Sequence, residues 1–401
     1  MKKLLYITNI SRGVSSFSVA AVRATEDLGV EFHLAGNFDG TTKESLRKNE
    51  KEYGVKLHQI DFIRTPYDLR NIKAYKQLVQ LMKREKFDAI HCNTPIGGVL
   101  GRLAGKKCKV RKIIYQAHGF HFYKGASKKN WLIYYPIEKW LAKYTDALIT
   151  INNEDYELAK SKFQLRHNGK VYYVPGVGID LSQYDLSDGI REKKRTELGL
   201  KETDFALISM GDLIERKNYS VAIKAMSKIS DLNIHYFICG KGPEEAKLIK
   251  LSEELGLRKR VHFLGYRNDI KELLKAADAF LFTSKQEGLA RSLMEAMASG
   301  LPCVVSNIRG NTDLLENTNS GFLCEATDVL AYTKKIKKLL DLNKPKKELV
   351  HSLIDRIVIN KDRVITIQYK CGVIPDNTFT YKNLNLARNP YGRKGKNQYS
   401  K

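Results

Sequence analysis

The sequence predicts an α/β protein built from two doubly wound parallel-sheet domains in tandem, followed by a basic tail of different character. Short apolar, β-branched runs alternate with helical patterns, and the runs are apolar at nearly every position, which is typical of parallel strands covered on both faces. The alternation restarts after a Pro-Gly-Val-Gly connection at residues 175–178 and stops near residue 340. The length of 401 residues also favours two domains over one.

The first domain is predicted to span residues 1–175. Its strands are expected at residues 4–10, 30–35, 56–62, 89–92, 112–117, 147–151 and 171–174. Helical patterns occupy residues 16–28, 69–85, 95–106, 131–144 and 154–163. Alternation of strand and helix in this order predicts a parallel sheet with helices on both faces.

The second domain is predicted to span residues 176–342, with strands at 205–210, 234–239, 261–264, 279–283, 302–306 and 321–324. In such domains the ligand binds at the carboxyl ends of the strands, so we expect a cleft with the two domains facing each other. The tail, residues 343–401, shows short alternating strands at 350–359 and 363–370, and a polar, basic end from 377 that we expect to be poorly ordered.

The chain is strongly basic, with 69 Lys and Arg against 44 Asp and Glu. Nucleic acid, anionic lipid and phosphorylated substrates all fit this charge. No helix-turn-helix or zinc finger is evident, so nucleic-acid binding is only an alternative. The six cysteines are scattered singly, with no C-x-x-C pair and no histidine at ligand spacing, so neither a disulfide framework nor a zinc site is indicated. Cys239 and Cys303 are expected to be buried in strands. No signal peptide or spanning segment is evident, so we expect a cytoplasmic protein.

The most informative stretch is residues 283–302. A strand is expected to end at Thr283, and a helix is expected to open at Gly288 and to end at Gly300. The amides of the first three residues of this helix would bind a diphosphate or a sugar hydroxyl: Gly288, Leu289 and Ala290. Glu295 lies eight residues after Glu287, about 12 Å along a helix axis, and would reach a ribose diol.

Glu287 and Glu295 with the Gly-Leu-Pro that follows resemble the E-x7-E motif of the retaining glycosyltransferases of family 4. This resemblance implies the GT-B architecture, two Rossmann-like domains facing across a cleft. It also implies transfer of a sugar from a nucleotide-diphosphate sugar to a hydroxyl, with Glu287 in a catalytic role. Arg216 and Lys217 resemble the basic pair that clamps the donor diphosphate in this family, although Asp212 stands where the family commonly has an arginine.

Further loops resemble the nucleotide-binding loops of the family. Gly211 ends the first strand of the second domain, and Gly240 and Gly242 would let backbone approach the nucleotide. Leu264 and Tyr266 would lie along the base. The resemblance implies that these residues bind the donor.

In the first domain His118 and the glycine after it resemble the active-site histidine of the family, which approaches the transferred sugar from the acceptor side. His121 is interpreted as a structural residue. Gly13 lies in the loop after the first strand, where family members often have paired glycines, and is the candidate for an acceptor-side loop.

No D-x-D triplet is present, which argues against a metal clamp on the donor, so no metal and no other cofactor is expected. The favoured donor is a UDP-sugar. Relatives of this type extend saccharides, often lipid-linked, in cell-surface or capsular polysaccharide synthesis. Residues 120–144 interleave aromatic residues with lysine, which fits either a peripheral site on the inner face of the cytoplasmic membrane or a core helix with a solvated lysine face.

Two features leave alternatives open. A non-hydrolysing nucleotide-sugar epimerase would share the two-domain architecture. Residues 351–370 resemble the end of a large serine recombinase rather than the closing helices of the family, which suggests a truncated or recombined gene with impaired activity.

Overall fold

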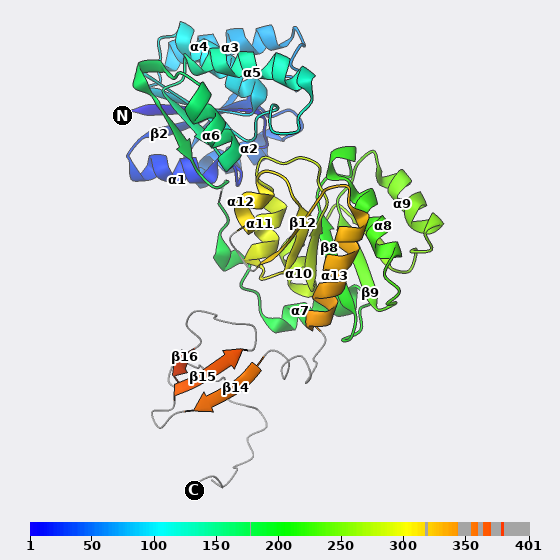
Figure 1. Ribbon diagram of the computed structural model, residues 1–401. Helices are drawn as coiled ribbons and strands as arrows, with labels where there is room; N and C mark the ends of the chain where they lie inside the picture. The colour runs from blue at the N-terminus through cyan, green and yellow to red at the C-terminus, as the bar shows by residue number, and fades with distance from the viewer. Residues whose placement is uncertain (177, 317–319, 344–353, 360–363, 370–377, 381–401) are drawn as a thin grey trace. The chain divides into compact units, whose positions relative to one another are not determined.

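The computed structural model describes residues 1–176, 178–316, 320–343, 354–359, 364–369 and 378–380. Contacts divide the chain into two compact units, Met1–Ile336 and Lys337–Lys401. The first unit contains two parallel sheets with helices around them (Figure 1). The predicted α/β class with two doubly wound sheets is therefore confirmed, whereas the domain boundaries after residues 175 and 342 stay predictions.

The first sheet has seven parallel strands in the order β3-β2-β1-β4-β5-β6-β7. The strands are β1 (Lys3–Ile10), β2 (Glu31–Asn37), β3 (Lys56–Gln59), β4 (Ala89–Asn93), β5 (Lys112–Ala117), β6 (Ala147–Thr150) and β7 (Lys170–Tyr173). The helices are α1 (Val19–Asp27), α2 (Lys43–Tyr53), α3 (Asn71–Glu85), α4 (Pro95–Lys107), α5 (Lys128–Ala142) and α6 (Asn153–Lys162), with a short turn η1 (Arg166–Asn168). Every strand predicted here is present, with ends displaced by a few residues at most.

Two separate cores cover the two faces of this sheet. Leu5 and Ile7 of β1 pack with α3, α4 and α5, which lie together in Figure 1. Tyr6, between them, points to the opposite face and packs with Phe32 and Leu34 against α1 and α2. Successive side chains of a strand alternate between faces, so a strand covered on both sides needs apolar residues at every position.

The second sheet has six parallel strands in the order β10-β9-β8-β11-β12-β13. The strands are β8 (Phe205–Met210), β9 (Ile234–Cys239), β10 (Val261–Gly265), β11 (Ala279–Phe282), β12 (Cys303–Ser306) and β13 (Gly321–Cys324). The helical segments are η2 (Leu181–Gln183), α7 (Asp188–Glu197), η3 (Glu215–Lys217), α8 (Tyr219–Ser227), α9 (Glu245–Glu254), α10 (Ile270–Ala276), α11 (Arg291–Ala298), α12 (Asn311–Leu315) and α13 (Val329–Asn343). Cys239 and Cys303 are buried in strands, as predicted.

The strand order fixes where a ligand can bind. In both sheets the strand order reverses beside the first strand: the next two strands lie on one side of it, and the following strand lies on its other side. The reversal occurs between β1 and β4 and between β8 and β11. Loops leaving the carboxyl ends of strands diverge at such a switch point and leave a crevice. The candidate residues Gly13, His118, Lys217 and Glu287 follow β1, β5, β8 and β11 respectively, on or near the strands at these two points.

The second unit contains a small antiparallel sheet of β14 (Ile354–Ile359), β15 (Val364–Tyr369) and β16 (Thr378–Thr380). The two predicted strands of the tail are confirmed over their described residues, and Ile357 pairs with Ile367. The predicted disorder of residues 377–401 falls mostly outside the described residues. The likeness of residues 351–370 to a serine recombinase stays a prediction.

Candidate active site

Two loops of the second sheet meet around the carboxylate of Glu287, in the loop after β11. Its Oε1 accepts hydrogen bonds from Arg216 Nη1 and Lys217 Nζ, each at 2.8 Å, and from Ser284 Oγ at 2.7 Å. The side chains of Glu287 and Lys217 are largely buried, whereas that of Arg216 is 39% exposed. Two cations share one carboxylate, so the cluster keeps a positive charge. The structure therefore brings together three residues that the sequence predicts to be catalytic.

The loop after β8 is shaped to hold Lys217 in this position. Gly211 has φ +145°, and a Cβ on it would lie 3.3 Å from Lys217 Cε. Asn218 adopts the left-handed conformation, with φ 56°, and its side chain donates to the carbonyl of Thr283 at 3.2 Å. Asn218 therefore ties the basic loop to the end of β11. The sequence signal that could have found it is an asparagine directly after the basic pair, a residue that tolerates this conformation.

The helix after Glu287 begins later than predicted. α11 starts at Arg291, and Ala290 is its N-cap in an extended conformation. The predicted opening at Gly288 is wrong, because a Cβ on Gly288 would collide with the carbonyl oxygen of His118, so this segment is held by another loop rather than by helical hydrogen bonds. Leu289 lies in the same non-helical turn. The predicted end is confirmed, with Gly300 in the left-handed region at φ +75°.

Glu295 lies on the second turn of α11, four residues after Arg291. Arg291 Nε donates to its Oε1 at 2.9 Å, and burial together with this carboxylate raises the pKa of the neighbouring Tyr184. Only about 6 Å of helix separates Arg291 from Glu295. The separation of Glu287 and Glu295 by 12 Å of a single helix is therefore wrong, since Glu287 precedes the helix.

His118 follows β5 and is held in one protonation state. Its Nε2 lies 3.1 Å from Asn93 Oδ1, and Asn93 Nδ2 donates to the carbonyl of His91. Asn93 Oδ1 is therefore the acceptor, His118 Nε2 carries the proton, and Nδ1 is available as an acceptor. Burial lowers the pKa of His118 to about 4, so the ring is neutral at neutral pH.

Three glycines let the loops around the site approach each other. Gly119 has φ +116°, and a Cβ on it would lie 2.8 Å from the Cα of Gly288. Gly310 has φ +78°, and a Cβ there would collide with the carbonyl oxygen of Gly288. A side chain at Gly119 or Gly288 would separate the loop after β5 from the loop after β11, and one at Gly310 would separate the loop after β12 from the loop after β11. Gly288 and the residue after His118 are thus required for packing.

Arg309, which the sequence did not single out, joins the same two loops. Its Nη1 donates to Asp155 Oδ1 at 2.6 Å, its Nη2 to the carbonyl of Phe120 at 2.5 Å, and its Nε to the carbonyl of Glu287 at 3.1 Å. The side chains of Arg309 and Asp155 are 4% and 1% exposed. Burial raises the pKa of Asp155, and the guanidinium opposes that shift. Nothing in the local sequence marks these two residues, which are far apart in the chain.

The predicted nucleotide loops pack mainly on each other. A Cβ on Gly240 would collide with the carbonyl of Gly211, and one on Gly242 with a carbonyl of the loop after β8. A glycine is therefore required at both positions so that the loop after β9 can pack against the loop after β8. Leu264 is partly buried against the core of the second sheet, and Tyr266 is 72% exposed.

Gly13 lies in the loop after β1 at φ +115°, and a Cβ on it would lie 2.6 Å from Asn49 Oδ1. Asn49 of α2 accepts from the amide of Val14 at 2.8 Å. Gly13 thus shapes this loop by packing on α2. Its neighbours Arg12 and Ser15 line a cavity of about 540 Å³ that reaches His118.

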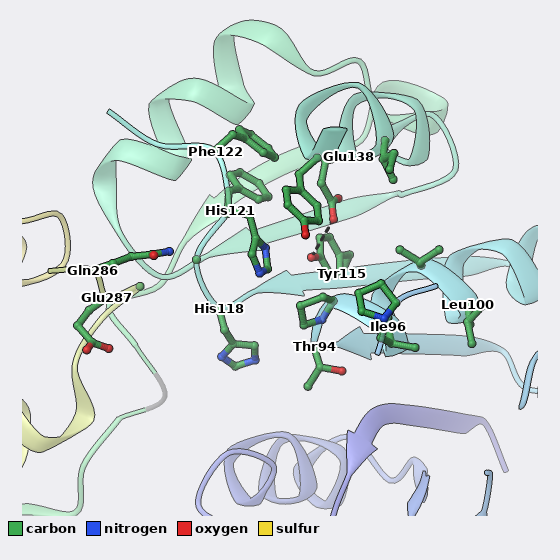
Figure 2. A pocket seen from close by; sticks show the side chains of 18 of the residues that line it. Thr94, Ile96, Leu100, Tyr115, His118, His121, Phe122, Glu138, Gln286 and Glu287 are labelled. Carbon is green, nitrogen blue, oxygen red and sulfur yellow. Dashed lines mark hydrogen bonds between the residues drawn. The ribbon is translucent and has the colours of Figure 1, made fainter. Parts of the chain in front are cut away.

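A second cavity, of about 490 Å³, lies between His118 and the helices α4 and α5 (Figure 2). Figure 2 shows Gln286 and Glu287 on one side of it and Tyr115 and Glu138 on the other. His121, interpreted from the sequence as structural, also lines it, with its ring 4.7 Å from that of Tyr134.

Comparisons with known proteins agree with this arrangement. Residues 4–152 match a family model described as glycosyl transferase 4-like, and residues 190–355 match one described as glycosyl transferases group 1. The putative glycosyltransferase EpsD of Bacillus subtilis is 34% identical over 343 residues, covering 84% of this chain and 87% of that protein. The chain belongs to the glycosyltransferases of family 4.

Other similar proteins include a galactosyltransferase named for a diphosphoundecaprenol-linked acceptor and an enzyme of lipopolysaccharide biosynthesis. An Escherichia coli UDP-Gal:α-D-GlcNAc-diphosphoundecaprenol α-1,3-galactosyltransferase is 32% identical over 278 residues, covering 68% of this chain and 71% of that protein. Among solved structures, Anabaena HepE in complex with UDP-glucose superposes with a TM-score of 0.68 at 19% identity, covering 86% of this chain and 91% of that one. WaaG, a glycosyltransferase of lipopolysaccharide biosynthesis, gives 0.65 at 19% identity, covering 84% and 90%. These structures confirm the GT-B fold of this glycosyltransferase.

Proposed function

We propose that this glycosyltransferase moves a sugar from a UDP-sugar to a hydroxyl of a lipid-linked saccharide, with retention of configuration, in the synthesis of a cell-surface or capsular polysaccharide. The donor is supported by the E. coli relative, whose name gives UDP-Gal, and by HepE, which binds UDP-glucose. The acceptor is supported by the same E. coli enzyme, whose name gives a saccharide on diphosphoundecaprenol.

The observation that carries the proposal is the convergence of Arg216 and Lys217 on Glu287 Oε1. A lysine ammonium has three N–H donors, so its bond to Glu287 leaves two for a diphosphate. Arginine adds a planar fork that suits phosphate oxygens. The pair would bind the donor diphosphate, and it would stabilise the negative charge that grows as the sugar departs.

Glu287 and Glu295 take the two positions of the E-x7-E motif. Glu287 holds both cations in place before the donor binds, and it lies at the end of the 490 Å³ cavity beside His118, next to the proposed donor site. Glu295 would accept from the ribose hydroxyls, exchanging its bond to Arg291 for them. The amides at the start of α11 would meet the diphosphate between the two carboxylates.

Retention follows from a reaction on one face of the sugar. The bond between C1 and the diphosphate oxygen breaks while the acceptor oxygen bonds to C1 on the same face, and the acceptor proton passes to the departing diphosphate. His118 is neutral, so its Nδ1 can accept from a hydroxyl of the donor sugar and orient it. Because the cations belong to the chain, we propose that no metal and no other cofactor is required.

Membrane contact is proposed for the exposed side of α5. Trp140 and Leu132 are 47% and 77% exposed, and lysines at 128, 129, 139 and 143 lie on or beside the same helix. Trp131 instead packs on Phe122 in the core, so both interpretations of this stretch apply to different residues. Among the described helices, none has the length and apolar composition to cross a bilayer. We propose peripheral binding to the inner face of the cytoplasmic membrane. The test is cosedimentation with phosphatidylglycerol vesicles, which the Leu132→Gln and Trp140→Gln variants should weaken.

The deciding experiment measures thermal stabilisation by UDP-, GDP- and ADP-sugars, with EDTA present throughout. A ligand at 100 times its Kd adds about 2.7 kcal/mol of stability, so the true donor separates clearly from the others. The anomeric configuration of the product is then read by NMR. Interconversion of the nucleotide sugar without an acceptor would indicate the epimerase alternative, and salt-dependent DNA binding would indicate the nucleic-acid alternative.

A further inference from the structure

The cavity between His118 and α5 has the size and composition of a ligand site. Its volume of about 490 Å³ falls within the range of small-molecule pockets. Its walls are mainly apolar and aromatic, with Val99 and Leu100 from α4 and Tyr134 and Ile137 from α5. Such walls suit the C–H faces of a pyranose ring better than they suit a phosphate.

This cavity is continuous with the proposed donor site. Arg216, Gln286 and Glu287 line one end of it, and His118 lies beside them. The described residues that line the cavity of about 540 Å³ on the other side of His118 run from Tyr6 to His118 and do not include Glu287. A group that must meet the donor sugar at Glu287 is therefore better placed in the 490 Å³ cavity, which Glu287 lines, than in this one.

The carboxylate of Glu138 lines the far side of the cavity and is held by two buried side chains. Glu138 of α5 lies 2.8 Å from Arg102 Nη2 through its Oε2, and Arg102 is 1% exposed with its guanidinium 3.8 Å from the centre of the Tyr115 ring. Tyr115 OH donates to Glu138 Oε1 at 3.3 Å, and burial keeps the pKa of Tyr115 well above its usual value, so it stays protonated. The arginine contact is an ion pair without good hydrogen-bond geometry.

This arrangement leaves Glu138 with capacity for a ligand. An ionised carboxylate only accepts hydrogen bonds and offers about four sites for them. Its partners hold it from behind, while the carboxylate faces the cavity and is 13% exposed (Figure 2). The ion pair of Arg102 with Glu138 has no net charge, so it does not attract an anion into the cavity. The carboxylate that faces the cavity accepts hydrogen bonds only, so an uncharged hydroxyl donor is favoured.

We infer that this cavity binds the acceptor sugar and that Glu138 selects it by accepting hydrogen bonds from its hydroxyls, so that an uncharged pyranoside reaches the donor sugar at Glu287. The inference rests on the proposed function. It assigns a specificity role to Glu138, with Arg102 and Tyr115 as the positioning residues that hold its carboxylate.

The test separates acceptor use from donor use. The acceptors are the octyl glycosides of glucose, galactose and N-acetylglucosamine. Their binding is measured by saturation-transfer NMR with UDP present. Donor use is measured separately, as hydrolysis of the UDP-sugar without acceptor. For Glu138→Gln we expect the acceptor KM to rise about 10- to 100-fold, the loss of a hydrogen bond to a charged group, with hydrolysis unchanged. Val99→Trp, which fills the cavity, should abolish glycoside binding and leave hydrolysis intact.

Two further variants serve as comparisons. Glu157→Gln, an exposed carboxylate on α6, should leave the acceptor KM unchanged. Ile10→Trp narrows the cavity on the other side of His118 and should leave glycoside binding intact. Loss of binding in Ile10→Trp but not in Val99→Trp, an unchanged KM in Glu138→Gln, or no saturable glycoside binding to the parent enzyme would overturn the inference. Failure of the parent enzyme to bind or hydrolyse any nucleotide sugar would instead reject the proposed function.

Discussion

Removing one partner of the Arg309–Asp155 ion pair should destabilise the protein strongly. Both side chains are almost completely buried and their charged atoms lie 2.6 Å apart, so Arg309→Met leaves an uncompensated carboxylate in the interior. Breaking a buried pair in this way costs about 3 to 5 kcal/mol. The total stability of a domain is about 5 to 15 kcal/mol, so the loss is a large part of it.

The assay is urea unfolding of the single and double variants. Asp155→Asn keeps an acceptor for the amide of Phe120 but leaves the guanidinium unpaired, so it should cost a similar amount. The double variant Asp155→Asn with Arg309→Met contains neither charge, and it should be less destabilised than the sum of the single variants, by about 1 to 3 kcal/mol. The surface pair of Lys247 and Glu244, 2.8 Å apart, is the control, where Lys247→Met should cost about 0 to 1 kcal/mol.

Activity should follow the same pattern, because Arg309 Nε also holds the backbone carbonyl of Glu287. Variants that leave the loop after β11 free should lose kcat even where folding is complete, since small displacements of reacting groups lower rates steeply. Additive stability effects of the two substitutions, or full kcat in a folded Arg309→Met enzyme, would refute the reasoning.

Other predictions test single positions. Glu295→Ala should weaken UDP binding by about 1.5 to 3 kcal/mol in calorimetry, and unchanged affinity would remove its ribose assignment. Lys217→Ala should lower kcat as well as donor affinity, because its interaction strengthens as the diphosphate departs; a normal kcat at saturating donor would place it outside the site. Gly119→Ala should cost about 1 to 3 kcal/mol and reduce kcat, since its Cβ would press on the loop after β11. Burial holds the pKa of His91 and His118 at about 4 in the folded state, against 6.5 in the unfolded chain. The free energy of unfolding should therefore fall as the pH drops from 6.5 towards 4, by on the order of 2 kcal/mol for each histidine at pH 5. In urea titrations His91→Gln should reduce this dependence on pH.

The architecture, the carboxylate of Glu287 and the cations beside it could be predicted from local sequence patterns and the family resemblance. Parallel strands covered on both faces require apolar residues at every position, as Leu5, Tyr6 and Ile7 show, and this pattern is local. The basic pair at 216–217 and the carboxylate at Glu287 could be named because the short segments that contain them resemble motifs of the family. The tertiary structure then showed the two cations sharing one carboxylate oxygen.

Other features of the site depend on contacts between segments that are distant in the sequence. The start of α11 at Arg291 follows from the packing of Gly288 on the loop after His118, which overrides the local tendency to form a helix. The same reason hides the pairing of Arg309 with Asp155, and the support of Glu138 by Arg102, from any local pattern. The last two are ion pairs between side chains on different elements. Their charges attract strongly only in the low-dielectric interior that folding creates, so no local pattern marks them.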